Sequence, residues 1–132
     1  MTSIIQPLDL TIGILSWKGN RTLERSLKSY QKSGLLDLAK NIIIFDNEHS
    51  SSISKYIKNT SNIIVLSKDN LGIAPAIKIL TDITQTEYFL FLENDWVCVE
   101  DKPIVVSRIK QGLKFLENKE CDVIRYRHRF NY

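Results

Sequence analysis

The chain has few cysteines and no long apolar run, and each of these shortages excludes a class of protein. Two cysteines, Cys98 and Cys121, cannot form the disulfide framework of a small secreted domain. No stretch approaches the roughly 20 apolar residues that a transmembrane helix needs, and the first residues lack the basic and apolar regions of a signal peptide. We therefore expect a soluble, cytoplasmic protein with reduced thiols and no transmembrane segment.

Charge of one sign is also scarce. The formal net charge of the 132 residues is +3, which is too small for the dense basic face that duplex nucleic acid requires. The small positive excess fits a protein that handles anionic small molecules. The chain length suits one domain with a single core, so we expect a single domain over residues 1–132 and no nucleic-acid partner.

Short apolar runs alternate with longer amphipathic stretches along the chain. The apolar runs indicate buried strands, and apolar residues three and four positions apart indicate helices. Strands are predicted over residues 10–17, 41–45, 62–66, 87–92 and 122–130, and helices over 20–32, 53–57, 72–84 and 103–118. Strict alternation is typical of parallel strands joined by right-handed crossovers. The expected fold is therefore α/β: a three-layer α/β/α sandwich with a mainly parallel, Rossmann-like central sheet.

Ligands bind at the carboxyl ends of the strands in such sheets, and polar residues follow four of the predicted strands. Glu93-Asn94-Asp95 follows the most hydrophobic strand candidate. Two carboxylates two positions apart can direct oxygens toward one Mg²⁺ or Mn²⁺ ion, because these hard cations prefer oxygen ligands. The alternative is a solvated acidic turn, since motifs this short recur by chance.

Each of the other three strand ends also has two interpretations. Asp46-Asn47 could accept a hydrogen bond from the edge of a nucleotide base, or it could form an Asx turn. Ser16-Trp17 could offer an aromatic face to a base or sugar, or Trp17 could pack on the next helix. Residues 69–72 precede a helix whose first N–H groups would favour an anion, or form an ordinary capped turn.

Basic residues form a row in the last predicted strand. Alternation places Arg125, Arg127 and Arg129 on one face and His128 on the other, apolar face. The arginines could bind phosphate or an acidic acceptor, but we favour an exposed strand face whose charge discourages edge pairing. Lys78, in the helix over 72–84, is likewise interpreted as solvent-facing rather than as a diphosphate ligand.

Taken in order, these segments resemble the nucleotide-binding half of glycosyltransferases with the GT-A fold, most closely the large inverting family 2. Residues 11–27 are similar to that family's opening strand, aromatic-bearing loop and first helix, and residues 42–47 to its second strand, which ends in an Asp that reads the base. Residues 69–72 resemble its Asn-x-Gly segment, and residues 88–95 the strand that leads to its metal-binding DxD signature.

The resemblance implies roles for particular residues. Trp17 and Asp46 would flank the nucleotide base, and Asp95 would bind the metal at the diphosphate, with Glu93 near the ribose or the metal. The implied nucleotide-binding set is Ser16, Trp17, Asp46, Asn47, Asn70, Gly72 and Glu93, and the implied metal ligands are Asp95 and Glu93. The implied cofactor is Mn²⁺ or Mg²⁺. The expected donor is a nucleoside-diphosphate sugar, and a UDP-sugar is favoured over the others.

The chain also departs from the family pattern. The signature is Glu-Asn-Asp rather than Asp-x-Asp, so a one-carboxylate site through Asp95 is possible; an extra residue in 17–20 alters the first loop. Ile77 stands where the family often has a basic residue. The family's acceptor-binding half and catalytic base ordinarily follow the point where these 132 residues stop, so we expect a donor-binding half and assign no catalytic residue.

The expected function is a metal-dependent glycosyltransferase that moves a sugar from a nucleoside diphosphate to the hydroxyl of an acceptor of unknown identity. One alternative is a non-catalytic nucleotide-sugar-binding domain. Another is a sugar nucleotidyltransferase, which normally has a glycine-rich, basic loop after its first strand. Residues 16–21 contain only one glycine, so this second alternative is disfavoured.

Overall fold

The computed structural model describes residues 6–48 and 62–126. Its elements run in the order β1 (Leu8–Ser16), α1 (Asn20–Lys32), the 3₁₀ helix η1 (Leu36–Leu38), β2 (Ala39–Asp46), β3 (Ile63–Ser67), α2 (Ile73–Ile83), β4 (Tyr88–Glu93) and α3 (Lys102–Glu117). The first four predicted strands and three of the predicted helices are found within a few residues of the expected ends. The short helix predicted over 53–57 lies outside the described residues.

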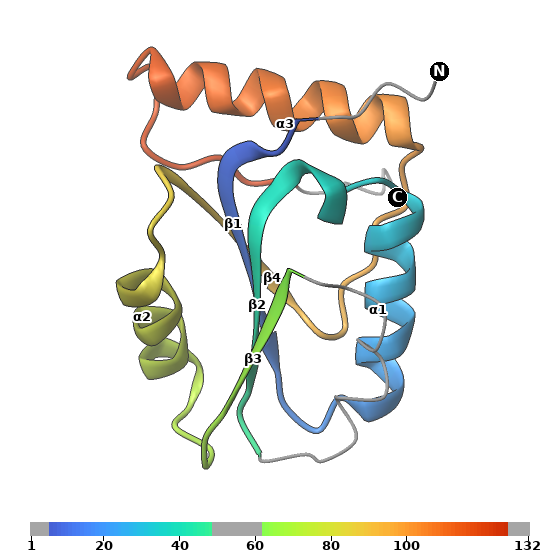
Figure 1. Ribbon diagram of the computed structural model, residues 1–132, viewed down its shortest axis with the longest axis vertical. Coiled ribbons are helices and arrows are strands. Elements are labelled where there is room, and N and C mark those ends of the chain that lie inside the picture. Colours follow the sequence, from blue (N-terminus) through green and yellow to red (C-terminus); the bar gives the residue numbers. More distant parts are fainter. Residues whose placement is uncertain (1–5, 49–61, 127–132) are drawn as a thin grey trace, which may run out of the picture.

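The four strands form one sheet in the order β3-β2-β1-β4, and all neighbours are parallel. Helix α1 covers one face of the sheet and α2 the other, while α3 lies across the end where β1 begins (Figure 1). This is the Rossmann-like α/β sandwich that the alternation of strands and helices predicted. Parallel strands covered on both faces require near-continuous apolar runs. Such runs in the sequence are the reason that the strands could be predicted.

Alternate residues of each strand pack on opposite sides of the sheet. On the α1 side, Ile12 and Ile44 are completely buried in a cluster with Leu23 of α1 and Ile109 of α3. On the α2 side a smaller cluster contains Leu15, Ile43, Phe45, Ala76 and Leu80. Gly13 also faces this side, and a Cβ there would lie 2.5 Å from the Phe89 ring. The glycine therefore makes room for that ring.

The strand predicted over 122–130 is wrong for residues 122–126, which form no strand; the remainder lies outside the described residues, as do Arg127, His128 and Arg129. The described segment returns beside α3, where the Tyr126 hydroxyl donates to the Arg108 carbonyl oxygen at 3.2 Å. Ile124 and Tyr126 also approach the space beside Gly112. Alternating apolar residues can thus pack on a helix as well as in a sheet, and Arg125 is exposed.

Two further expectations concern side chains and membranes. Cys98 and Cys121 are both free and half-buried. Lys78 is exposed and pairs with Asp82 one turn along α2, as a solvent-facing lysine would. In the part of the chain that the structure describes, no helix has the length and apolar character to cross a membrane.

Candidate functional site

Because all four strands are parallel, their carboxyl ends lie along one edge of the sheet, in the lower half of Figure 1. The pairing register aligns Ser16 with Asp46 and Asp46 with Ser67, and it places Leu15 opposite Glu93. The predicted residues at the ends of β1, β2 and β4 therefore lie side by side. We call this set of strand ends and the loops that follow them the carboxyl edge.

Glu93 and Asp95 place two carboxylates at the carboxyl edge. Glu93 is half-buried and Asp95 is exposed. Partial burial, and then the negative charge of Asp95, raise the pKa of the Glu93 carboxyl above its ordinary value. Among the described residues, no hydrogen bond or ion pair is made to the Asp95 carboxylate. The two groups repel each other, and a bound cation would relieve that repulsion.

The acidic groups of this edge do not form a cluster. Within residues 6–48 and 62–126, no three or more His, Cys, Asp or Glu side chains converge, as a metal site built from protein ligands alone would require. Two carboxylates are what these residues offer a cation. That donor set fits Mg²⁺ or Mn²⁺ in the form in which one or two protein carboxylates share the ion with substrate phosphates and water; it does not fit an ion held by protein ligands alone.

The raised pKa of Glu93 predicts a pH dependence of stability in the absence of metal. A carboxyl whose folded-state pKa lies above its unfolded value stabilises the fold while it is protonated, and this contribution is lost as pH rises from 4.5 through the raised value. Glu93→Gln is therefore expected to raise the midpoint of thermal unfolding at pH 7 slightly and to flatten its pH dependence above pH 4.5. Unfolding scans of both proteins across pH check this; identical profiles would contradict it.

Asn94, between the two carboxylates, holds the triplet against the loop after β1. The Trp17 N–H donates to Asn94 Oδ1 at 3.3 Å, and Asn94 Nδ2 donates to Thr22 Oγ1 at 2.7 Å. A Cβ at Gly19 would overlap the Asn94 amide, so a larger residue there would have to displace that amide from its partners. The sequence analysis had given Asn94 no role of its own; its side chain is the connection between Trp17 and the acidic pair.

Polar side chains on one face of α1 hold the segment that follows β4. Ser26 Oγ donates to the Asn94 carbonyl oxygen at 2.6 Å. The Tyr30 hydroxyl lies 3.1 Å from the Glu93 carbonyl oxygen and 2.8 Å from that of Trp96. Tyr30 is 1% exposed, and burial is the main reason that its pKa is raised, so its hydroxyl remains a donor at neutral pH.

Tyr30 is three residues from Leu27 and seven from Leu23, so helical spacing places it on the apolar face of α1. A signal of its second role was present, because Thr22, Ser26 and Ser29 recur at spacings of four and three along α1, which puts them on one face. The Ser29 hydroxyl oxygen accepts from the Cys98 N–H at 3.0 Å. The peptide groups of residues 93–98 are thereby tied to α1.

Asp46 at the end of β2 is 1% exposed. One carboxylate oxygen accepts from the Glu48 N–H at 3.2 Å and the other from the Ser67 hydroxyl at 3.3 Å. The first of these contacts is the Asx-turn alternative. The base-reading role of Asp46 stays a prediction, and it requires a ligand to compete for oxygens that already have partners.

Asn47 ties β2 to the loop that precedes α2. Its side-chain oxygen accepts from the Leu71 N–H at 2.9 Å, and its amide nitrogen donates to Asn70 Oδ1 at 3.2 Å. Asn70 Oδ1 also accepts from the Gly72 N–H at 2.9 Å. Gly72 has a φ of 81°, in a region that favours glycine. The three predicted residues Asn47, Asn70 and Gly72 are thus brought together, as one hydrogen-bonded turn.

The two residues that end the first strand region differ in accessibility. Ser16 is buried, whereas Trp17 is 48% exposed. The Lys18 ammonium lies 4.7 Å from the centre of the Trp17 ring, a cation–π distance. About half of the Trp17 side chain therefore remains open at the carboxyl edge.

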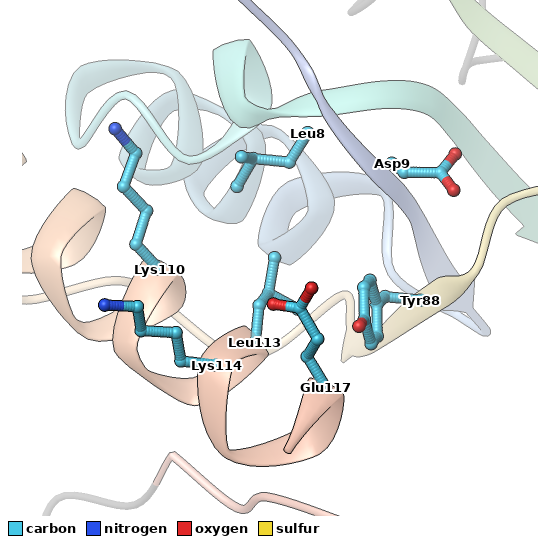
Figure 2. A pocket seen from close by; sticks show the side chains of 7 residues that line it. All are labelled: Leu8, Asp9, Tyr88, Lys110, Leu113, Lys114 and Glu117. Carbon is cyan, nitrogen blue, oxygen red and sulfur yellow. The ribbon is translucent and has the colours of Figure 1, made fainter. Parts of the chain in front are cut away.

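An open hollow of about 230 Å³ lies at the opposite end of the sheet (Figure 2). It is lined by Leu8, Asp9, Tyr88, Lys110, Leu113, Lys114 and Glu117. None of the predicted site residues lines it. Its two lysines and two carboxylates offset each other in charge, so its lining does not select an ion of either sign.

Comparison with models of protein families and with curated proteins finds no match for this chain. The fold and the edge described above define a Rossmann-like α/β domain with an acidic strand end. The resemblance to GT-A glycosyltransferases stays a prediction from the sequence motifs.

Proposed function

We propose that this chain binds a nucleoside-diphosphate sugar together with Mn²⁺ or Mg²⁺, and that it serves the transfer of the sugar to an acceptor hydroxyl. The observation that supports this most is the link from Trp17 through Asn94 to the acidic pair Glu93 and Asp95. It puts an exposed aromatic ring and two carboxylates in neighbouring segments of the same edge. A nucleotide that shares a divalent cation with the protein needs both features.

Each end of such a ligand has residues to receive it. The base would stack on the open part of Trp17 beside β2, where the Asn47 turn closes the edge. The diphosphate would lie toward β4, where Asp95 is exposed and makes no hydrogen bond or ion pair with other described residues. Lys18, beside Trp17, adds a positive charge near the path between them.

The bound metal would supply neutralisation of the charge that develops on the departing diphosphate. Asp95 and Glu93 are the residues that would hold it, and their backbone is kept in place by Ser26 and Tyr30. Glu93 must lose its proton to take part. Because its pKa is raised, we propose that affinity for the metal begins to fall at a higher pH than it would for a glutamate with an ordinary pKa.

A second candidate is a domain that binds the nucleotide sugar without transferring it. In the described part of the chain, no third acidic, histidine or cysteine side chain joins the carboxylate pair, so none is placed beside it to deprotonate an acceptor. A nucleotidyltransferase is disfavoured by the loop after β1. There the space beside Gly19 is occupied by the Asn94 amide, and the loop has only one glycine where a phosphate-binding loop has several.

We further propose a cytoplasmic location. Both Cys98 and Cys121 are free and half-buried, as thiols are in a reducing compartment.

A panel of nucleoside diphosphates and nucleotide sugars, with Mn²⁺, with Mg²⁺ and with EDTA, tests the proposed function. We expect UDP and UDP-sugars to raise the unfolding temperature with Mn²⁺ and not with EDTA, because binding to the folded state alone stabilises it. Release of free sugar from a UDP-sugar would favour a transferase over a binding domain. If no nucleotide changes the unfolding temperature with either metal, the proposed function is wrong.

A further inference from the structure

Trp96 is an exposed tryptophan immediately after Asp95 that the sequence analysis did not assign. Its side chain is 46% exposed, although tryptophan is usually well covered in folded proteins. The Trp96 ring contacts the Phe91 ring of β4 nearly at right angles, with 6.0 Å between ring centres and an interplanar angle of 84°. The exposed part of Trp96 is open to solvent next in sequence to Asp95.

The backbone at Trp96 is held from two sides. Its carbonyl oxygen accepts from the buried Tyr30 hydroxyl at 2.8 Å, and its N–H donates to the Glu93 carbonyl oxygen at 3.3 Å. Together with the Phe91 contact, these bonds restrain the indole before any ligand arrives. A restrained aromatic ring loses little entropy on binding, which suits a stacking surface.

The order of the strands sets the direction in which a ligand would lie. The residues follow one another along the carboxyl edge in this spatial order: Asp46 at the end of β2, Trp17 after β1, then Asp95 and Trp96 after β4. A base on Trp17 that also reaches Asp46 of β2 would lie up to two strand spacings, about 10 Å, from β4, a separation that a ribose and a diphosphate can bridge. With the base at Trp17 and the diphosphate at Asp95, the next group of the donor reaches Trp96.

Building on the proposed function, we infer that Trp96 is a stacking surface for the sugar of the donor, and that this sugar is a neutral hexopyranose. The C–H groups on one face of a pyranose ring pack on an aromatic ring, while its hydroxyls donate to carboxylates such as Glu93. A sugar that carries its own carboxylate would be repelled by Glu93 and Asp95. Trp96 therefore contributes to the choice of sugar and does not contact the base.

The test compares UDP with UDP-glucose, UDP-galactose, UDP-N-acetylglucosamine and UDP-glucuronate, by calorimetry with Mn²⁺. In the unsubstituted chain, at least one neutral UDP-hexose is expected to bind about five- to tenfold more tightly than UDP, and UDP-glucuronate is not. In Trp96→Ala this advantage is expected to disappear, and Trp96→Phe is expected to keep part of it. Phe115→Ala, which truncates an aromatic residue of α3 that is 41% exposed, is the matched control and should leave the advantage intact.

Fluorescence gives a second readout, because Trp17 and Trp96 are the only tryptophans of the chain. In Trp17→Phe the emission comes from Trp96 alone, and a bound hexose should change it more than UDP does. If UDP binds but no hexose adds affinity, or if Trp96→Ala keeps the full advantage, the role of Trp96 is refuted while the proposed function stands. If none of the five ligands binds the unsubstituted chain, the proposed function fails and this inference fails with it.

Discussion

Asp95→Ala is expected to abolish the metal-dependent part of UDP binding. The loss should be about 100-fold in affinity with Mn²⁺, on the order of 3 kcal/mol, because this carboxylate is exposed and no described residue forms a hydrogen bond or ion pair with it. Binding in EDTA should be unchanged. Calorimetric titrations with UDP, with Mn²⁺ and with EDTA, measure both quantities in the same samples.

The fold should survive this substitution, since an exposed side chain is removed. Asp82→Ala is the matched control: it also removes an exposed aspartate, one that pairs with Lys78 on α2 away from the carboxyl edge. A further readout is internal to the site, because removing the charge of Asp95 should lower the raised pKa of Glu93. If Asp95→Ala and Asp82→Ala bind UDP equally well with Mn²⁺, Asp95 is not the metal ligand.

Tyr30→Phe is expected to lower the free energy of unfolding by about 1–3 kcal/mol. The substitution removes one hydroxyl and leaves the carbonyl oxygens of Glu93 and Trp96 without their donor from α1. Urea denaturation followed by circular dichroism measures the change. Affinity for UDP with Mn²⁺ should fall as well, because the segment that carries Asp95 is then less restrained.

Tyr88→Phe is the control for this second prediction. Tyr88 is the first residue of β4, the strand that ends at Glu93, and it is half-buried. Tyr88→Phe therefore also removes a tyrosine hydroxyl, but far from the carboxyl edge. We expect it to cost less stability and to leave UDP affinity unaltered. Equal losses in the two variants would mean that the Tyr30 contacts with Glu93 and Trp96 have no special weight. A loss of stability without a loss of affinity would restrict Tyr30 to supporting the fold.

The pattern of apolar residues was sufficient for most of the fold. Strands covered on both faces need continuous apolar runs, as at residues 41–45, and amphipathic helices need the spacing seen over 20–32. These patterns are local, so they can be found without knowing which strands pair. The same reasoning failed at residues 122–126, because alternation of apolar and polar residues only says that one side is covered. There the covering element is α3, not a neighbouring strand.

The candidate site divides in the same way. The sequence indicated which residues follow the strands, and the topology rule for parallel sheets indicated that they would meet. It could not indicate that Asn94 bonds Trp17 and Thr22, which lie 77 and 72 residues away along the chain. Nor did it indicate that Asp46 is buried with partners while Asp95 is exposed, two states that determine which carboxylate can receive a cation.

The acidic triplet summarises what each level determined. The sequence by itself placed Glu93-Asn94-Asp95 at the end of an apolar strand, because five apolar residues precede it. Only the tertiary structure decided what each residue of the triplet does: Asn94 and the backbone are bound by α1 and the loop after β1, Glu93 is half-buried, and Asp95 is left exposed. The physical reason is that hydrogen bonds and burial depend on segments brought together from distant parts of the chain, whereas hydrophobic periodicity depends on neighbours alone.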